Sequence, residues 1–201
     1  MAFIPWVHEK VELLQHYHRI SEVGEIVRRY FALNAFDGVL TTLGVLVGAY
    51  LGGVQSRRTV VTVVLTTAVG MSVSGFYGSY LVEKAERDRA MRDLEGSTLS
   101  SLADTDIASA SRYATILIAV VDGASPFIAA LVCLIPFVFT NLGIRAEYIA
   151  AMAIAFLETF LLGVFLGRVS RQRWVVAGLK FTGAALIALV ISVLLERRIG
   201  P

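Results

Sequence analysis

The chain has 201 residues, of which 56% are hydrophobic and 17% charged, and its mean hydropathy is +0.71. Soluble domains average about 45–50% apolar and about 25% charged residues, so this composition excludes an ordinary soluble domain and a disordered chain. A net charge of +2, spread along the chain, argues against nucleic acid as a partner, and the single cysteine, Cys133, excludes an intramolecular disulfide.

Residues 1–29 lack the basic start and apolar core of a cleavable signal peptide, and charges occur throughout residues 5–29. Their apolar side chains recur at roughly helical spacing, which predicts an amphipathic helix on the cytoplasmic membrane surface. His8, Glu12 and His16 follow at intervals of four residues and share one face of that helix. They are either solvated surface side chains or ligands of a divalent cation.

Five later stretches are nearly free of charge and long enough to cross a bilayer core of about 30 Å. They cover residues 30–56, 59–82, 113–144, 148–167 and 174–195. The third contains Pro126 and Pro136, which predict a kinked helix followed by a loop. The predicted fold is therefore all-α: a polytopic membrane protein with a five-helix transmembrane bundle, in which residues 30–82 form the first two spans and residues 112–201 the last three.

Residues 83–111, between these two groups of spans, are predicted to form a short, charged, cytoplasmic helical segment. Oppositely charged side chains stand four residues apart in it, as they do in solvated, salt-bridged helices. These pairs are Glu83 with Arg87, Asp88 with Arg92, and Arg89 with Asp93, and Gly96 is predicted to end the helix.

The Lys and Arg residues outside the spans predict the orientation. With the N-terminus inside, twelve lie on the cytoplasmic side and five on the outer side, so the positive-inside rule predicts a cytoplasmic N-terminus and an external C-terminus. We expect a multi-pass protein of a prokaryotic cytoplasmic membrane, although a vacuolar membrane protein would show the same features.

Small residues recur every four positions in the first two spans. They form two ridges, which allow helices to approach closely in lipid. The ridges are Gly44, Gly48 and Gly52 in the first span, and Gly70, Ser74 and Gly78 in the second. They predict either internal helix packing or a subunit interface.

Four ionisable side chains fall inside the apolar stretches: Asp37, Asp122, Glu158 and Lys180. Each costs at least ~2.5–3.5 kcal/mol at bilayer depth, so we expect them to face a cavity, one another or an ion. Three acids and one base leave two negative charges, enough to balance one divalent cation. Carboxylates suit Mg, Ca and Mn, and Met71 at similar depth would favour Fe(II). Alternatively, Lys180 pairs with one acid or extends to the interface, and protonated acids form hydrogen bonds between helices.

A weak internal repeat links two of these acids. Asp37-Gly38 and Asp122-Gly123 each open an apolar run, and nine positions later both runs read Leu-Val. Both dipeptides fall on helices that run outward in the predicted topology, so the repeat would be parallel, with a site at the repeat interface.

At these residues the chain resembles the vacuolar iron transporter family, which carries Fe(II) and Mn(II). The segment NAFDGVLTTLGVLVGAYLGG resembles the first span of the family, AVGMSVSGFYGSYLVEKAERD the second, and AVVDGASPFIAALVCLIPFVF the third. The segment LLGVFLGRVSRQRWVVAGLKFTGAALIALVISVLLERRIG resembles the end of the family's chain, and the likeness covers residues 28–200.

The resemblance implies a five-helix bundle that forms a homodimer, with the ion path near the subunit interface and lined by Asp37 and Met71. It also implies export of Fe²⁺ or Mn²⁺ from the cytosol in exchange for protons, with no resident cofactor and no enzymatic activity. A carboxylate that binds metal when ionised and releases it when protonated provides a route to such coupling.

Two departures from the family pattern concern other candidate residues. The family's long glutamate-rich cytoplasmic segment corresponds here to the short residues 83–111, in which Glu83, Glu86 and Asp93 are either a small metal reservoir or solvated side chains. Where the family often has Glu in the last span, this chain has Lys180, and its charge would repel a metal ion unless it pairs with an intramembrane acid.

The alternative functions are an integral-membrane enzyme or lipid-modifying protein that uses the same acids, a carrier of another small solute, and a non-transporting scaffold. The sequence has no clustered histidines, no Gly-x-Ser-x-Gly turn and no His-Glu-x-x-His pair, so no reaction is indicated.

Overall fold

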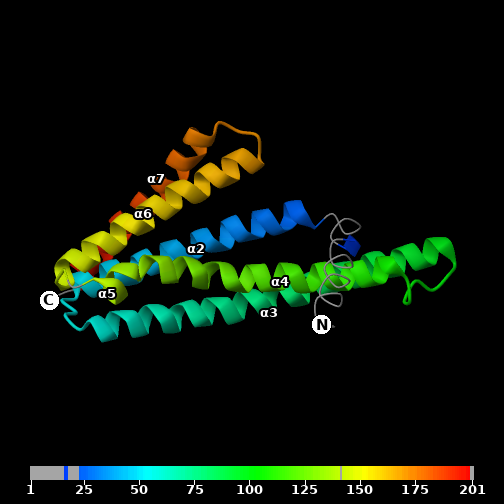
Figure 1. Cartoon of the computed structure of the whole chain (residues 1–201), viewed down its shortest axis with the longest axis horizontal. Helices are drawn as coiled ribbons and strands as arrows, with labels where there is room; N and C mark the ends of the chain where they lie inside the picture. The colour runs from blue at the N-terminus through cyan, green and yellow to red at the C-terminus, as the bar shows by residue number, and fades with distance from the viewer. Residues whose placement is uncertain (1–15, 18–22, 141, 200–201) are drawn as a thin grey trace, which may run out of the picture.

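The computed structural model describes residues 16–17, 23–140 and 142–199, and this part of the chain is helical (Figure 1). Five helices are long and apolar enough to cross a membrane, which confirms the all-α fold and the five predicted spans of a multi-pass membrane protein. The helices are α2 (Gly24–Leu51), α3 (Arg57–Thr98), α4 (Asp106–Cys133), the short α5 (Ile135–Phe139), α6 (Ile144–Val169) and α7 (Trp174–Ile199).

Helix α2 occupies the centre of the bundle, where it packs against α4, α6 and α7. Helices α3 and α4 form one antiparallel hairpin and α6 and α7 form another. Figure 1 shows that the two hairpins diverge: the loop end of the α6–α7 hairpin lies farther from α3 and α4 than its other end does. Helix α2 begins at one end of the bundle and α7 ends at the other, as an odd number of spans requires.

Side-chain caps begin two of the helices. Ser56 Oγ accepts a hydrogen bond of 3.3 Å from the backbone N–H of Thr59 at the start of α3, and Thr105 Oγ1 accepts one of the same length from Ala108 at the start of α4. Each cap satisfies a backbone donor that has no partner within its helix.

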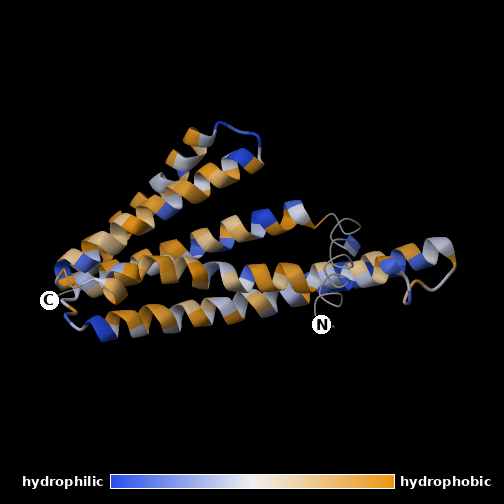
Figure 2. Cartoon of the chain, viewed as in Figure 1, coloured by the Kyte–Doolittle hydropathy of each residue, from blue (hydrophilic) through white to orange (hydrophobic). Residues whose placement is uncertain are grey.

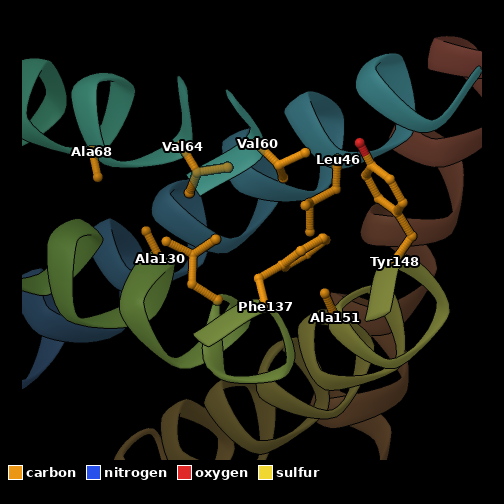
Figure 3. Close-up of a cluster of buried hydrophobic side chains, with 9 residues drawn as sticks. Leu46, Val60, Val64, Ala68, Ala130, Phe137, Tyr148 and Ala151 are labelled. Atoms are coloured by element: carbon orange, nitrogen blue, oxygen red, sulfur yellow. The ribbon is translucent and has the colours of Figure 1, made fainter. Parts of the chain in front are cut away.

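One apolar cluster closes the bundle at the end where α2 meets α3 (Figure 3). Leu46 of α2, Val60 and Val64 of α3, Phe137 of α5 and Tyr148 of α6 are all at most 1% exposed. The Tyr148 hydroxyl donates a hydrogen bond of 3.0 Å to the backbone carbonyl of Val54, so this buried polar atom is satisfied. The loop predicted after the third span contains a short helix, α5, and Phe137 of this helix packs in the cluster.

Helix α3 is longer than a bilayer requires. Its 42 residues correspond to about 63 Å, twice the thickness of the hydrocarbon core. Figure 2 shows apolar residues along the spans and hydrophilic ones at the far end of the α3–α4 hairpin. Residues 83–98 continue α3 and residues 106–111 open α4, so the predicted segment 83–111 is the tip of this hairpin rather than a separate unit.

Two details predicted for this segment are corrected. Gly96 does not end the helix: α3 continues to Thr98 and ends where Leu99 adopts a left-handed conformation with φ 51°. Of the three predicted ion pairs, Glu83–Arg87 forms, with Oε2 and Nε 3.3 Å apart. Within the described helices the other two pairs do not form, because their side chains extend into solvent instead.

Most of the predicted N-terminal helix, including His8 and Glu12, lies outside the described residues. Residues 24–29 of that range belong to α2. His16 Nε2 lies 3.5 Å from a carboxylate oxygen of Asp106 at the start of α4, so this histidine lies beside the α3–α4 hairpin.

Candidate functional site

Asp122 is the most enclosed of the predicted site residues. It lies in the middle of α4 and is only 7% exposed. Ser79 Oγ of α3 lies 2.6 Å from its Oδ2, and its Oδ1 has no hydrogen-bond partner among the described residues. A buried carboxylate with one free oxygen is costly in an apolar environment, so this atom is the first candidate ligand of a cation.

Glycines bring the helices around Asp122 close together. A Cβ at Gly123 of α4 would lie 2.7 Å from the carbonyl oxygen of Ser72 in α3, and one at Gly38 of α2 would lie 2.5 Å from Cα of Pro126 in α4. Real Cβ atoms essentially never approach other atoms so closely, so α4 can contact both neighbours only where glycine is present.

A row of polar groups leads from Asp122 toward the tip of the α3–α4 hairpin. Ser79 is followed one turn later on α3 by Glu83, which is 7% exposed. The hydroxyl of Tyr30, on α2, donates a hydrogen bond of 3.3 Å to Glu83 Oε1 and lies within electrostatic range of Asp122 and Glu86. The structure therefore brings Glu83 and Asp122 into one polar row, and Glu86 stands exposed at its end.

Asp37 is on the helix that packs against Asp122's helix, but it faces outward. The adjacent Gly38 contacts Pro126, one turn after Asp122 on α4, whereas the side chain of Asp37 is exposed on the surface of α2. Farther along the same helix, a Cβ at Gly44 or Gly48 would meet no atom within 4 Å. The ridge on α2 is therefore not an internal packing surface in the described chain.

The second predicted ridge, on α3, is also uncovered. Gly70 and Gly78 likewise have no atom within 4 Å of a Cβ, and Ser74 is exposed. Met71 lies next to this ridge and is half-buried, eight residues or about 12 Å before Ser79 on α3.

Glu158 lies apart from the two aspartates. Its Oε2 is 2.9 Å from Cys133 Sγ, which donates to it, and Cys133 stands eleven residues, about 16 Å, from Asp122 along α4. Glu158 also borders a pocket of about 180 Å³ together with Phe31 and Ala35 of α2. The same pocket extends to Ser125, one turn after Asp122, but the hydrogen bond of Glu158 is to Cys133 and not to either aspartate.

Lys180 does not pair with an intramembrane acid. Its side chain is exposed, and across the described ranges it has no ion pair. It stands six residues, about 9 Å, from Trp174 at the start of α7, so its long side chain can reach the interface.

No group of three or more His, Cys, Asp and Glu side chains in the described part of the chain is arranged to hold a metal ion. Of the predicted metal site, the described part of a single chain therefore provides Asp37 and Asp122, on two helices that pack together.

Glu147, a buried acid that sequence reasoning missed, lies near the start of α6. It is fully buried, and Arg57 at the start of α3 reaches it with two nitrogens: Nε donates to Oε2 at 3.0 Å and Nη2 to Oε1. The signal in the sequence was an acid and an arginine at the same predicted end of two spans. This pairing satisfies the charge of Glu147, in contrast to that of Asp122.

Comparisons with known proteins show one similarity along nearly the whole chain. The chain is 27% identical over 177 residues to an uncharacterized protein of Methanocaldococcus jannaschii, MJ0645, and the match covers 87% of this chain and 91% of the relative. No family model matches the chain, and no solved structure matches it.

Proposed function

We propose that this chain transports divalent transition-metal cations, Fe²⁺ or Mn²⁺, out of the cytosol in exchange for protons. The observation that carries the proposal is the pair of neighbouring aspartates at bilayer depth, of which Asp122 is buried with a free oxygen. Two adjacent carboxylates repel each other, and both are costly in hydrocarbon, so a divalent cation would stabilise them together. The resemblance of both Asp-Gly spans to iron and manganese carriers supports the same function.

A second copy of the chain would complete the site. Asp37 is exposed at bilayer depth, where contact with lipid is unfavourable, and the open ridge at Gly44 and Gly48 lies on the same helix. Small residues let helices from two subunits approach closely, and a dimer would double the number of carboxylates near Asp37. Met71, beside the open ridge on α3, would add a thioether ligand that favours Fe²⁺.

The hydroxyl of Ser79 supports proton exchange at Asp122. Ser79 Oγ lies within hydrogen-bond distance of two oxygens, Asp122 Oδ2 at 2.6 Å and the backbone carbonyl of Gly75 at 2.5 Å. A hydroxyl has one proton, so it donates either to the ionised carboxylate or to the carbonyl. In the second case, a protonated Asp122 donates to Ser79. Both protonation states are therefore accommodated without moving the helices.

The polar row at the cytoplasmic end would serve as the entry. Glu86 is exposed, and Glu83 accepts a hydrogen bond from Tyr30 and pairs with Arg87, so carboxylate oxygens stand between the hairpin and Asp122. Such a row would offer successive oxygen ligands to a cation that moves toward Asp122.

The test is uptake of Mn²⁺ and Fe²⁺ into sealed liposomes with an imposed pH gradient. We expect Asp37→Asn and Asp122→Asn each to lower metal flux at least about tenfold, because each removes one charge of the pair. Asp104→Asn, which changes an exposed carboxylate in the α3–α4 loop, is the matched control and should retain full flux. Full flux in both test variants, or flux that does not respond to the pH gradient, would contradict the proposal.

A further inference from the structure

A charged pocket lies between α3 and α4 at the end of the membrane span. It has a volume of about 460 Å³, and its lining includes four cations and two acids: Lys84, Arg87, Arg92, Arg112, Asp88 and Glu95. Glu95 Oε1 is already engaged, because it accepts a hydrogen bond of 2.7 Å from the backbone N–H of Leu102. The cations outnumber the acids in the lining, so the pocket has an excess of positive charge and suits an anion rather than a metal cation.

Three of these cations are available to a ligand. Lys84, Arg92 and Arg112 are exposed, and within the described residues none of them forms an ion pair. Arg112 makes one hydrogen bond, of 3.2 Å, to Ser109 Oγ. Arg87 is the exception, since it pairs with Glu83.

An apolar groove continues from this pocket along the same two helices. It has a volume of about 420 Å³ and is lined by Val73 and Phe76 of α3 and by Val120 and Ala124 of α4, among others. These side chains lie within the charge-free stretch 59–82 of α3 and the matching part of α4. The groove therefore opens toward the hydrocarbon layer.

The pocket and the groove are adjacent. Tyr80 borders the charged pocket and Phe76 the groove, and their rings stack with an interplanar angle of 4° and centroids 6.4 Å apart. On α4, Ile116 of the pocket is one turn before Val120 of the groove. Charged and apolar surfaces thus follow one another along the bilayer normal, with the charge at the level where the apolar run ends.

We propose that this surface binds one anionic phospholipid, with its phosphate among Lys84, Arg92 and Arg112 and an acyl chain in the groove. The charge complementarity and the order of the two surfaces match a lipid that lies in the leaflet predicted to be cytoplasmic. Basic pockets between helices on that side recognise anionic headgroups, whereas a zwitterionic headgroup gains much less from the same cations. Gly123, the neighbour of Asp122, borders the groove, but neither aspartate lines the pocket or the groove, and the proposal does not depend on transport.

The experiment measures lipid binding to the purified full-length protein in detergent by native mass spectrometry. The probes are phosphatidylglycerol and phosphatidylcholine with identical acyl chains. We expect phosphatidylglycerol to bind at least about tenfold more tightly, since each cation near the headgroup contributes about a fivefold factor. The variant K84Q/R92Q/R112Q should lose at least about tenfold in affinity. All three side chains are exposed, so their replacement leaves the helix packing intact.

The matched control is R58Q/R89Q/R145Q, which removes three exposed arginines that do not line the pocket. It should bind phosphatidylglycerol as the wild type does, and equal losses in the two triple variants would overturn the proposal. A124W, which fills the groove, should weaken lipid binding as well.

Three further results would overturn the proposal. The first is equal affinity of the wild type for the two lipids. The second is complete displacement of phosphatidylglycerol by millimolar inorganic phosphate, which would indicate a site for a soluble anion. The third is a change of oligomeric state in A124W with unchanged lipid binding, which would indicate that a second copy occupies the groove.

Discussion

The two Asp-Gly segments have the same sequence and different environments. In α4, Asp122 is 7% exposed and bonded to Ser79, and Gly123 contacts α3. In α2, Asp37 is exposed, while Gly38 contacts Pro126 of α4. The glycine serves the same purpose in both segments, close approach to a neighbouring helix, but only one of the two acids is enclosed by the single chain.

This difference shows what the dipeptide determines. Neighbouring positions on a helix differ by about 100° in direction, so a glycine and the acid before it need not share an environment. In α4 both residues contact α3, since Gly123 packs against Ser72 and Asp122 reaches Ser79, whereas in α2 Gly38 contacts α4 and Asp37 is uncovered in the single chain. The apparent repeat therefore predicts helix contacts better than it predicts a symmetric site.

The largest expected effect concerns Glu147. This buried acid has an ion-pair partner, Arg57, whereas Asp122 has none among the described residues. Arg57→Gln leaves Glu147 buried without its partner, so we expect the free energy of unfolding to fall by about 3–5 kcal/mol. Thermal or denaturant unfolding in detergent micelles measures this loss. Arg58→Gln, which alters the exposed neighbouring arginine, should have little effect. Equal stability of the two variants would show that the Arg57–Glu147 pair contributes nothing.

The next effect tests the glycines. Gly38→Ala and Gly123→Ala each place a Cβ against a neighbouring helix, at 2.5 Å and 2.7 Å, and should destabilise the protein by about 1–3 kcal/mol. Gly44→Ala, where a Cβ meets nothing within 4 Å of this chain, is the control. The same unfolding measurement applies. If Gly44→Ala proves as harmful as Gly38→Ala, the helix contacts assigned to the Asp-Gly segments are wrong.

The smallest effect distinguishes the two acids. Asp122→Glu pushes a longer side chain into the enclosed space beside Ser79, whereas Asp37→Glu extends into open space. In the liposome assay we expect Asp122→Glu to lower metal flux about tenfold, a barrier difference of about 1.4 kcal/mol, while Asp37→Glu retains much of it. The reverse order would mean that Asp37 is the more tightly confined acid in the working protein.

The spans were predictable because hydrophobic length is a local property: about 20 apolar residues must form a helix in lipid, whatever surrounds them. The end of α3 was not, because Gly96 is a weak stop signal within a helix that the hairpin with α4 extends. The sequence also did not show which of the unusual side chains lie close together. The sequence marks Asp122, Glu158 and Lys180 as unusual. Only the packing of the helices shows that Glu158 of α6 bonds to Cys133 of α4, and that Lys180 is exposed on α7, which packs against α6 and α2.

Ser79, Tyr30 and Glu147 carried too little signal to be selected. A serine or tyrosine in a membrane helix is common, and its partner depends on which face meets the next helix. Glu147 lies at the edge of a span, where an acid costs little, and only the fold shows that it is fully buried against Arg57.

The most direct test of the central claim, that Asp37 and Asp122 hold a divalent cation, is a structure of the protein in lipid with Mn²⁺ and its anomalous signal. We predict Mn²⁺ within coordination distance of a carboxylate oxygen of Asp37 or Asp122, and its loss in a matched structure of Asp37→Asn. Mn²⁺ bound elsewhere, with both aspartates unoccupied and facing lipid or sealed by apolar side chains, would contradict the account.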